Sequence, residues 1–243
     1  MEAASPEAAA LLVAILAVAA VVQGFLGFGF GIVAMSGLTL SHDLLHAAGV
    51  VNLAGILVSS TVLWRLRAHV LWRPALRMLP AIVVGVAVGV TALRALDREV
   101  MVRVLGATIV VISGWNLWTP RLRRDESARA DVALGLLGGL LAGAFNTGGP
   151  PLVAHLYRRP DPPDAVKATI QVLFLSMSTL RAPMAAAQGL LSGAMLRDAL
   201  LAAVFVVAGI LLGIRLAQRL HPDHARRAAW LGLGALGLAL LLR

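Results

Sequence analysis

The stretch Gly143-Ala144-Phe145-Asn146-Thr147-Gly148-Gly149-Pro150-Pro151 interrupts an apolar segment with a pair of glycines followed by a pair of prolines. A continuous helix does not tolerate this combination, because glycine weakens a helix and proline lacks the backbone N–H. Inside a membrane, backbone groups freed by such a break have to be buried in protein or line a cavity. We therefore expect the stretch to form a buried turn or the wall of a site.

A second break, Gly24-Phe25-Leu26-Gly27-Phe28-Gly29-Phe30-Gly31, lies one half-chain earlier. Paired breaks in the two halves of a membrane protein are the best sequence indication of a transport site. Tight turns expose backbone N–H groups, and a helix that restarts after each turn directs its N-terminus at the same point, which favours an anion. Pro150 and Pro151 suit the first turn of such a helix. The alternative is that these glycines only allow close helix packing.

The composition is that of a membrane protein. The 243 residues are 59% hydrophobic and 14% charged, and the mean hydropathy is +0.86. Soluble domains carry about 25% charged residues, and apolar runs of spanning length recur from end to end, which leaves no room for a soluble domain. The net charge of +9 comes from basic residues in short loops, where they orient a protein in the bilayer. We therefore expect no binding of nucleic acid, and the absence of cysteine excludes disulfide and thiolate chemistry.

The sequence predicts an all-α polytopic membrane protein with two related halves: residues 1–118 and 131–243, joined by a basic linker at 119–130. Each half has a broken apolar segment followed by three continuous ones, and Ser41-His42-Asp43 is a plausible helix start. We expect Pro183 to follow the end of one segment. The expected segments are 8–23 with 32–40, 46–64, 79–93, 100–117, 132–145 with 152–156, 165–182, 196–216 and 228–242.

An offset of 119 residues (143 − 24 = 119) aligns the two breaks and places Asn52 on Gln171. The same offset places Ser59 and Ser60 on Ser178 and Thr179. Later in each half an offset of 124 matches Gly85 and Gly89 with Gly209 and Gly213. Glycine matches alone arise easily in so glycine-rich a chain, whereas the amide and hydroxyl matches indicate an internal repeat.

Charges in the loops indicate that the repeat is inverted. The loop at 65–77 is strongly basic, whereas its equivalent at 184–196 has no Lys or Arg. Basic loops face the cytoplasm, so corresponding loops face opposite sides. Inversion needs an odd number of crossings in each half, and we therefore expect each half to be a re-entrant, broken helical hairpin plus three transmembrane helices. The N-terminus then lies outside, and loops 65–77, 119–130, 158–167 and 217–227 lie inside.

The two hairpin tips meet near the midplane in this arrangement and supply most of the candidate site. The amides Asn52 and Gln171 lie in apolar spans, where either ligand binding or interhelical hydrogen bonds would satisfy them. Arg181 either extends to the outer interface, which we favour slightly, or binds an oxyanion through two hydrogen bonds. The candidate substrate-binding residues are Phe28, Gly29, Phe30, Gly31, Asn52, Asn146, Thr147, Gly148, Gly149, Pro150, Gln171, Ser178 and Arg181.

Signatures of enzymes are absent from the sequence: it has no nucleoside-triphosphate loop and no His-Glu-x-x-His motif. We expect no catalytic residue, no metal site and no cofactor. The acidic residues lie at segment ends or in loops, which argues against a cation site built on carboxylates within the membrane. His155 is either a proton or hydrogen-bond partner or, as is more common for a lone histidine, structural.

Both breaks, with Asn52 and Gln171 following them at similar spacing, resemble the sulfite exporter TauE/SafE family, also called the 4-toluene sulfonate uptake permease family. The similarity covers nearly the whole chain. The chain departs from the family pattern at Ala34-Met35-Ser36, where the family often has a proline, and at Asn146-Thr147, where the family often has an extra glycine. The resemblance implies transport of sulfite, thiosulfate, sulfoacetate or related organosulfonates, and a location in a bacterial inner membrane.

The first hypothesis is a secondary transporter that works by alternating access around a central anion site. An anion channel of the same architecture is the alternative, and a membrane-embedded enzyme or assembly factor is a third. The partners expected of the transporter are the lipid bilayer and a small sulfur-containing anion. Coupling to protons or another ion, assembly as a homodimer and the direction of transport stay open at this point.

Overall fold

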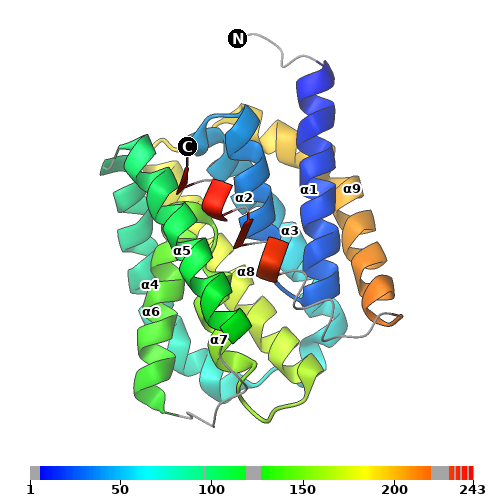
Figure 1. Ribbon diagram of the computed structural model, residues 1–243, viewed down its shortest axis with the longest axis vertical. Coiled ribbons are helices and arrows are strands. Elements are labelled where there is room, and N and C mark those ends of the chain that lie inside the picture. Colours follow the sequence, from blue (N-terminus) through cyan, green and yellow to red (C-terminus); the bar gives the residue numbers. More distant parts are fainter. Residues whose placement is uncertain are drawn as a thin grey trace.

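The computed structural model describes residues 6–95, 97–118, 127–219 and 230–242, the last without 233, 236 and 240. Throughout this part of the chain the regular structure is helical (Figure 1). The helices are α1 (Pro6–Leu26), α2 (Phe30–Ser41), α3 (Leu44–Leu66), a short 3-10 turn η1 (Arg67–His69), α4 (Trp72–Ala95), α5 (Arg98–Trp118), α6 (Ala128–Phe145), α7 (Gly149–Leu156), α8 (Pro163–Ala187) and α9 (Gly193–Ala217). Short helical pieces follow from Trp230 onwards.

Both expected breaks are present. The first separates α1 from α2 and the second separates α6 from α7. Asp43 caps α3 as predicted, since its side chain accepts a hydrogen bond from the backbone N of Leu45 at 2.9 Å. The expectation that Pro183 lies beyond its helix is wrong, because α8 continues through it to Ala187. Proline inside a helix is tolerated in membranes, where neighbouring groups satisfy the freed backbone.

In the described part of the chain, six helices are long and apolar enough to cross a membrane: α1, α3 with η1, α4, α6, α8 and α9. The chain is therefore an all-helical, polytopic membrane protein, as predicted. With 12 and 8 residues, α2 and α7 measure only about 18 and 12 Å, less than the roughly 30 Å of a hydrocarbon core. Most of the expected linker lies outside the described residues, and its last three residues, 128–130, already belong to α6.

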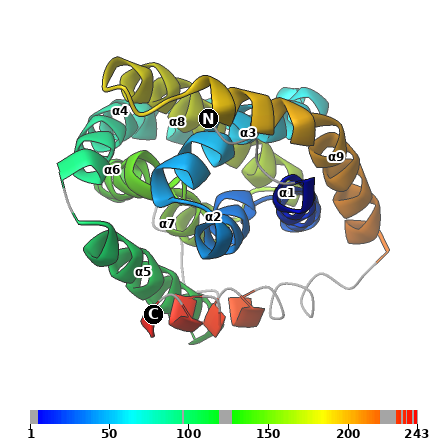
Figure 2. The ribbon, with the colours of Figure 1, turned by 90° about the horizontal axis from the view of Figure 1, so that it is seen from above.

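Helices from the first half of the chain pack against helices from the second half. Helix α1 packs along α9, α6 packs along α4, and α3 lies against α8. Figure 2 shows α1 and α9 on one side of the molecule and α4 and α6 on the other. The glycines that the 124-residue offset pairs lie in these contacts: a Cβ on Gly89 would collide with the carbonyl oxygen of Leu140, and one on Gly213 with that of Val21. Small residues thus let each helix pair approach closely.

Two loops that were expected on the same face lie together at one end of the molecule. The backbone N of Leu71, in the basic loop 65–77, donates to Thr169 Oγ1 at 2.9 Å, just beyond the loop 158–167. Helix α1 begins at the opposite end (Figure 1). Exposed apolar side chains such as Val84 on α4 and Val204 and Phe205 on α9 form the outer surface that lipid would cover.

Candidate functional site

The first break is a turn built on glycine and held by a glutamine. Gly27 and Gly29 have φ of 82° and 104°, a region that only glycine enters without strain. The side chain of Gln23 closes the turn, because its Oε1 accepts from the backbone N of Phe30 at 3.0 Å and its Nε2 donates to the carbonyl of Gly27 at 3.4 Å. The first N–H of α2 therefore has a partner inside the protein, although the helix has no side-chain cap at Gly29.

Gln171 joins α8 to this same turn. Its Nε2 donates to the carbonyl oxygen of Gly27 at 2.8 Å, and its Oε1 accepts from Gln23 Nε2 at 3.2 Å. Both glutamine side chains are buried. Of the two roles left open for Gln171, hydrogen bonding between helices is the one present in this structure.

The second break turns at Asn146, which has a φ of 56°. Asparagine enters the left-handed region more readily than most residues. Its backbone N donates to the carbonyl of Ala142 at 2.9 Å, and its side-chain Nδ2 donates to the carbonyl of Ala48 on α3 at 2.7 Å. Helix α7 then begins at Gly149, with Pro150 and Pro151 in its first turn, where the missing N–H of proline costs no helical hydrogen bond.

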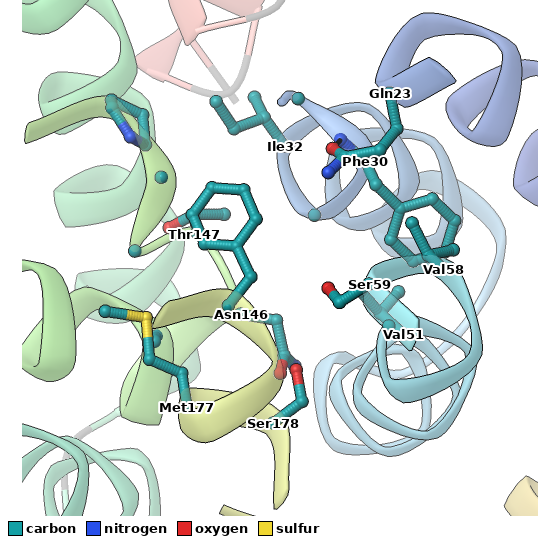
Figure 3. A pocket seen from close by; sticks show the side chains of 18 residues that line it. Gln23, Phe30, Ile32, Val51, Val58, Ser59, Asn146, Thr147, Met177 and Ser178 are labelled. Atoms are coloured by element: carbon teal, nitrogen blue, oxygen red, sulfur yellow. Dashed lines mark hydrogen bonds between the residues drawn. The ribbon is translucent and has the colours of Figure 1, made fainter. Parts of the chain in front are cut away.

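A cavity of about 60 Å³ lies between the two breaks. One water needs roughly 10–15 Å³ by this measure, so the cavity suits a small polyatomic ion or a few waters. Figure 3 shows Thr147 and Asn146 approaching it from one side and Ser59, Val51 and Val58 from the other. Nine of the thirteen candidate residues line it: Gly29, Phe30, Gly31, Asn146, Thr147, Gly148, Gly149, Pro150 and Ser178.

Thr147 gives the cavity a buried hydroxyl group. Its side chain is 3% exposed, and Oγ1 has no hydrogen-bond partner among the described residues. Ser59 and Ser178 also line the cavity, from α3 and α8. The walls therefore combine hydroxyl groups and backbone turns with the apolar side chains of Phe30, Phe174 and Met177.

Arg181 lies inside the bundle, so the favoured expectation that it extends to the outer interface is wrong. It is 2% exposed; its Nε donates to the carbonyl of Gly143 at 2.8 Å and its Nη1 to that of Ala48 at 3.3 Å. The physical reason is that carbonyls near the end of α6, left without helical partners, attract a cation. None of the ion pairs among the described residues includes Arg181.

Comparison with known proteins identifies the family. The family described as sulfite exporter TauE/SafE matches residues 11–240. The chain belongs to the sulfite exporter TauE/SafE family. It is 33% identical over 229 residues, 90% of its length and 88% of the relative's, to a probable sulfite/organosulfonate exporter TauE of Cupriavidus necator.

A second relative of this TauE/SafE chain is the probable inner membrane transporter protein TsaS of Comamonas testosteroni. It is 29% identical over 179 residues, 71% of this chain and 73% of the relative. Its name agrees with the inner-membrane location expected of this chain. No solved structure matches. The described residues of this chain include six helices long and apolar enough to span a membrane. This TauE/SafE member is a membrane transporter and not an enzyme, as expected.

Four candidate residues of the TauE/SafE chain lie outside the cavity lining: Phe28, Asn52, Gln171 and Arg181. The ring of Phe28 packs at a tilt of 32° against that of Trp230, with centroids 5.0 Å apart. Asn52 is fully buried, and neither its Oδ1 nor its Nδ2 has a hydrogen-bond partner among the described residues.

Sequence reasoning missed Gln23, which lines the cavity and orders the first turn. A lone amide at the end of an apolar segment, just before a glycine break, was the available signal. It also missed Asp131, because the segment was expected to begin at residue 132. Helix α6 instead begins at Ala128 and buries the Asp131 side chain completely. Asp131 lies in the first turn of this helix, at a segment end as expected, but inside the protein.

Proposed function

We propose that this chain is a secondary transporter that carries small sulfur-containing anions across the inner membrane by alternating access around the cavity between the two breaks. The observation that carries the proposal is a small cavity lined by both turns, close to a buried guanidinium that has no carboxylate partner among the described residues. A buried charge is costly without a counter-charge. An anion bound near the tips would supply it.

The substrate class follows from the charge and size of the site and from the relatives. Arg181 donates to the carbonyl oxygens of Gly143 and Ala48. Asn146, which lines the cavity, donates to the same Ala48 oxygen. The positive charge of Arg181 therefore lies next to a residue of the cavity wall. Sulfite, thiosulfate and sulfoacetate are anions of a size suited to a cavity of about 60 Å³. The name of the relative from Cupriavidus necator includes sulfite and organosulfonate.

Alternating access is supported by the arrangement of the halves. Under the proposed repeat α1 corresponds to α6 and α9 corresponds to α4, so the packed pair α1 with α9 is equivalent to the packed pair α6 with α4. Helices α3 and α8 correspond to each other and also contact each other. Helix α1 starts at one end of the molecule and α6 at the other (Figure 1), as inverted halves would. In such transporters one part moves against the other around a site near the midplane.

The experiment is counterflow in vesicles that contain the purified protein. Vesicles loaded with unlabelled sulfite, thiosulfate or sulfoacetate are diluted into a trace of the same labelled anion, and a transporter accumulates the label transiently against its gradient. A channel, the alternative of the same architecture, lets the label only equilibrate. Transport without preference for sulfur anions over chloride and acetate would contradict the proposed substrate class.

Gly148→Val is the matched test of the site. Gly148 has an ordinary φ of −66°, but a Cβ there would collide with the backbone oxygen of Gly138 and lie 2.8 Å from Ala142 Cβ. We expect a less stable variant without counterflow, and only the fraction that purifies as folded protein is assayed. The control is Gly193→Val, because nothing lies within 4 Å of a Cβ at Gly193. Normal counterflow by the Gly148 variant would overturn the assignment of the site.

A further inference from the structure

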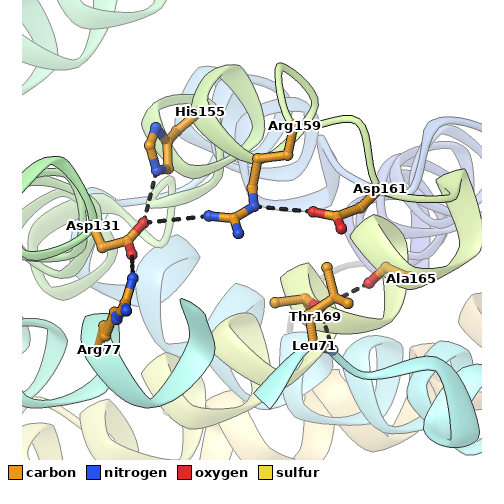
Figure 4. Close-up of polar contacts among 8 residues, drawn as sticks. All are labelled: Leu71, Arg77, Asp131, His155, Arg159, Asp161, Ala165 and Thr169. Atoms are coloured by element: carbon orange, nitrogen blue, oxygen red, sulfur yellow. Dashed lines mark hydrogen bonds and ion pairs between the residues drawn. The ribbon is translucent and has the colours of Figure 1, made fainter. Parts of the chain in front are cut away.

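Asp131 and His155 form a buried pair that links the two arms of the second hairpin. Asp131 lies in α6 and is completely buried, and His155 lies in the last turn of α7 and is 7% exposed. The Nε2 of His155 is 2.8 Å from Asp131 Oδ1 (Figure 4). We propose that this pair is a proton-binding site whose proton accompanies the transported anion, an inference that rests on the proposed function.

The groups around the pair set its charge. Arg77 Nη1, from α4, lies 3.5 Å from Asp131 Oδ2, and Arg159 Nη1 lies 4.0 Å from Asp131 Oδ1. Arg159 also pairs with Asp161 at 3.0 Å. Helices α5 and α8 pack against α7 as well, but among the described residues no charged group from either forms an ion pair with this cluster. Two carboxylates and two guanidiniums balance while His155 is neutral.

The two guanidiniums within 4.0 Å of Asp131 disfavour any added positive charge, whether a sodium ion or a proton on His155. Protonation of His155 is therefore favoured when an anion is bound nearby. The guanidiniums also keep Asp131 an acceptor. Because an ionised carboxylate only accepts hydrogen bonds, Nε2 of His155 carries the hydrogen of that bond. Nδ1 is then the atom that takes the added proton, and the product is an imidazolium held by Asp131. Histidine is the side chain whose charge ordinarily changes between about pH 5 and 8.

Helix α7 connects this pair to the cavity. Gly149 and Pro150, at its N-terminal end, line the cavity, and His155 lies six residues after Gly149, about 9 Å along the axis at 1.5 Å per residue. An anion at the N-terminus of a helix and a cation at its C-terminus are both favoured by the helix dipole. The opposite charges also attract each other. Binding of the anion therefore strengthens binding of the proton, and the reverse holds by the same factor.

Protonation also acts on a contact between the two halves. Arg77 belongs to α4, in the first half, and approaches the Asp131 atom that has no hydrogen-bond partner among the described residues. A positive charge on His155 competes with Arg77 for Asp131. The proton thus weakens the tie between the second hairpin and α4, two parts that have to separate in alternating access.

A second histidine–carboxylate pair provides the control. His46 Nε2 lies 2.9 Å from Asp198 Oδ2, and Arg197 pairs with Asp198 at 3.1 Å. Its side chains are 24% and 11% exposed, whereas Asp131 is fully buried, and neither His46 nor Asp198 lines the cavity. His46→Gln is therefore expected to leave coupling unchanged.

The test is calorimetric titration of the purified protein with sulfoacetate, in buffers that differ in their enthalpy of protonation. The carboxyl and sulfonate groups of sulfoacetate stay ionised between about pH 6 and 8, so any proton taken up belongs to the protein. We expect the wild type to take up as much as one proton per bound anion near pH 7, and its affinity to fall several-fold as the pH rises across this range. His155→Gln, whose amide still donates to Asp131, should take up none and bind with an affinity independent of pH, and His46→Gln should behave as the wild type.

Each other outcome is decisive. Anion binding by the wild type without proton uptake overturns the proton site and leaves the proposed function intact. Proton uptake that persists in His155→Gln and in Asp131→Asn, or that disappears in His46→Gln instead, overturns the assignment to this pair. If neither sulfoacetate nor thiosulfate binds to the wild type, the proposed function fails and the proton site fails with it. The wild-type titration decides the question even if both variants of the pair fail to fold.

Discussion

The Nε of Arg181 donates a hydrogen bond to the carbonyl oxygen of Gly143 at 2.8 Å. Through this contact α8 holds the end of α6 beside the second break. Arg181 Nη1 and Asn146 Nδ2 both donate to the carbonyl oxygen of Ala48 on α3. One guanidinium therefore ties three helices together at the point where the chain turns toward the cavity.

Arg181→Gln should abolish anion binding more than it harms folding. Glutamine keeps an N–H donor but removes the buried charge, and loss of one hydrogen bond to a carbonyl costs about 1–3 kcal/mol of stability. We expect the midpoint of thermal unfolding to fall slightly and its increase on adding a sulfur anion to disappear. Arg215→Gln, at an exposed position in α9, is the control. An unchanged ligand effect in Arg181→Gln would show that the guanidinium is only structural.

Asn52→Leu should stabilise the protein and impair transport. Both polar atoms of Asn52 are buried without a hydrogen-bond partner among the described residues, and an unsatisfied buried group costs about 1–3 kcal/mol. We attribute this cost to a second conformation in which the amide is paired, as Gln171 is paired with the first turn in this one. We expect a higher unfolding midpoint and at least about ten-fold slower counterflow. A destabilised variant with normal counterflow would contradict this role.

Gln23→Leu should loosen the first turn. The change leaves the backbone N of Phe30 without its partner, and we expect a loss of about 1–3 kcal/mol, seen as a lower unfolding midpoint in detergent. Gln218→Leu, exposed at the end of α9, should change stability by less than about 0.5 kcal/mol. Equal effects of the two substitutions would argue against a structural role for Gln23.

Gly89→Ala and Gly213→Ala should each separate a helix pair. A Cβ at these positions would collide with backbone oxygens of Leu140 and Val21, and overpacking typically costs about 1–3 kcal/mol. Gly114→Ala in α5 is the matched control. Nothing lies within 4 Å of a Cβ there, so alanine should gain about 0.5–1 kcal/mol from its higher helix propensity. Comparison of the three unfolding midpoints checks the prediction, and a Gly89 variant as stable as the Gly114 variant would refute it.

The sequence predicted the parts of the fold that local chemistry determines. The Gly and Pro residues of both breaks interrupt a helix wherever they occur, and the cap at Asp43 depends on residues only two positions apart. The glycine pairs that the offset of 124 aligned lie in the contacts between helices, because close approach in a membrane requires small residues wherever two helices cross.

Features that depend on distant partners were not predictable in this way. Whether Arg181 points inward depends on the carbonyl of Gly143, 38 positions earlier, and the burial of Asp131 depends on Arg77 and His155, which approach it from other helices. Hydropathy placed Asp131 at the edge of a segment, which agrees with its position in the first turn of α6, but it could not indicate that ion pairs bury the side chain. The path of α8 through Pro183 likewise depends on packing and not on the local sequence.

The most direct test of the central claim, that an anion binds between the two breaks, is thermal unfolding of the purified protein with a panel of anions. The panel contains sulfite, thiosulfate, sulfoacetate, sulfate, chloride and acetate, and the wild type is compared with Gly148→Val. A ligand that binds only the folded state raises stability by mass action, by about 2.7 kcal/mol at one hundred times its dissociation constant. We expect a higher unfolding midpoint with one or more sulfur anions, no increase with chloride or acetate, and loss of the increase in the Gly148 variant. An equal shift in both proteins, or no selective shift with any anion in the panel, would contradict it.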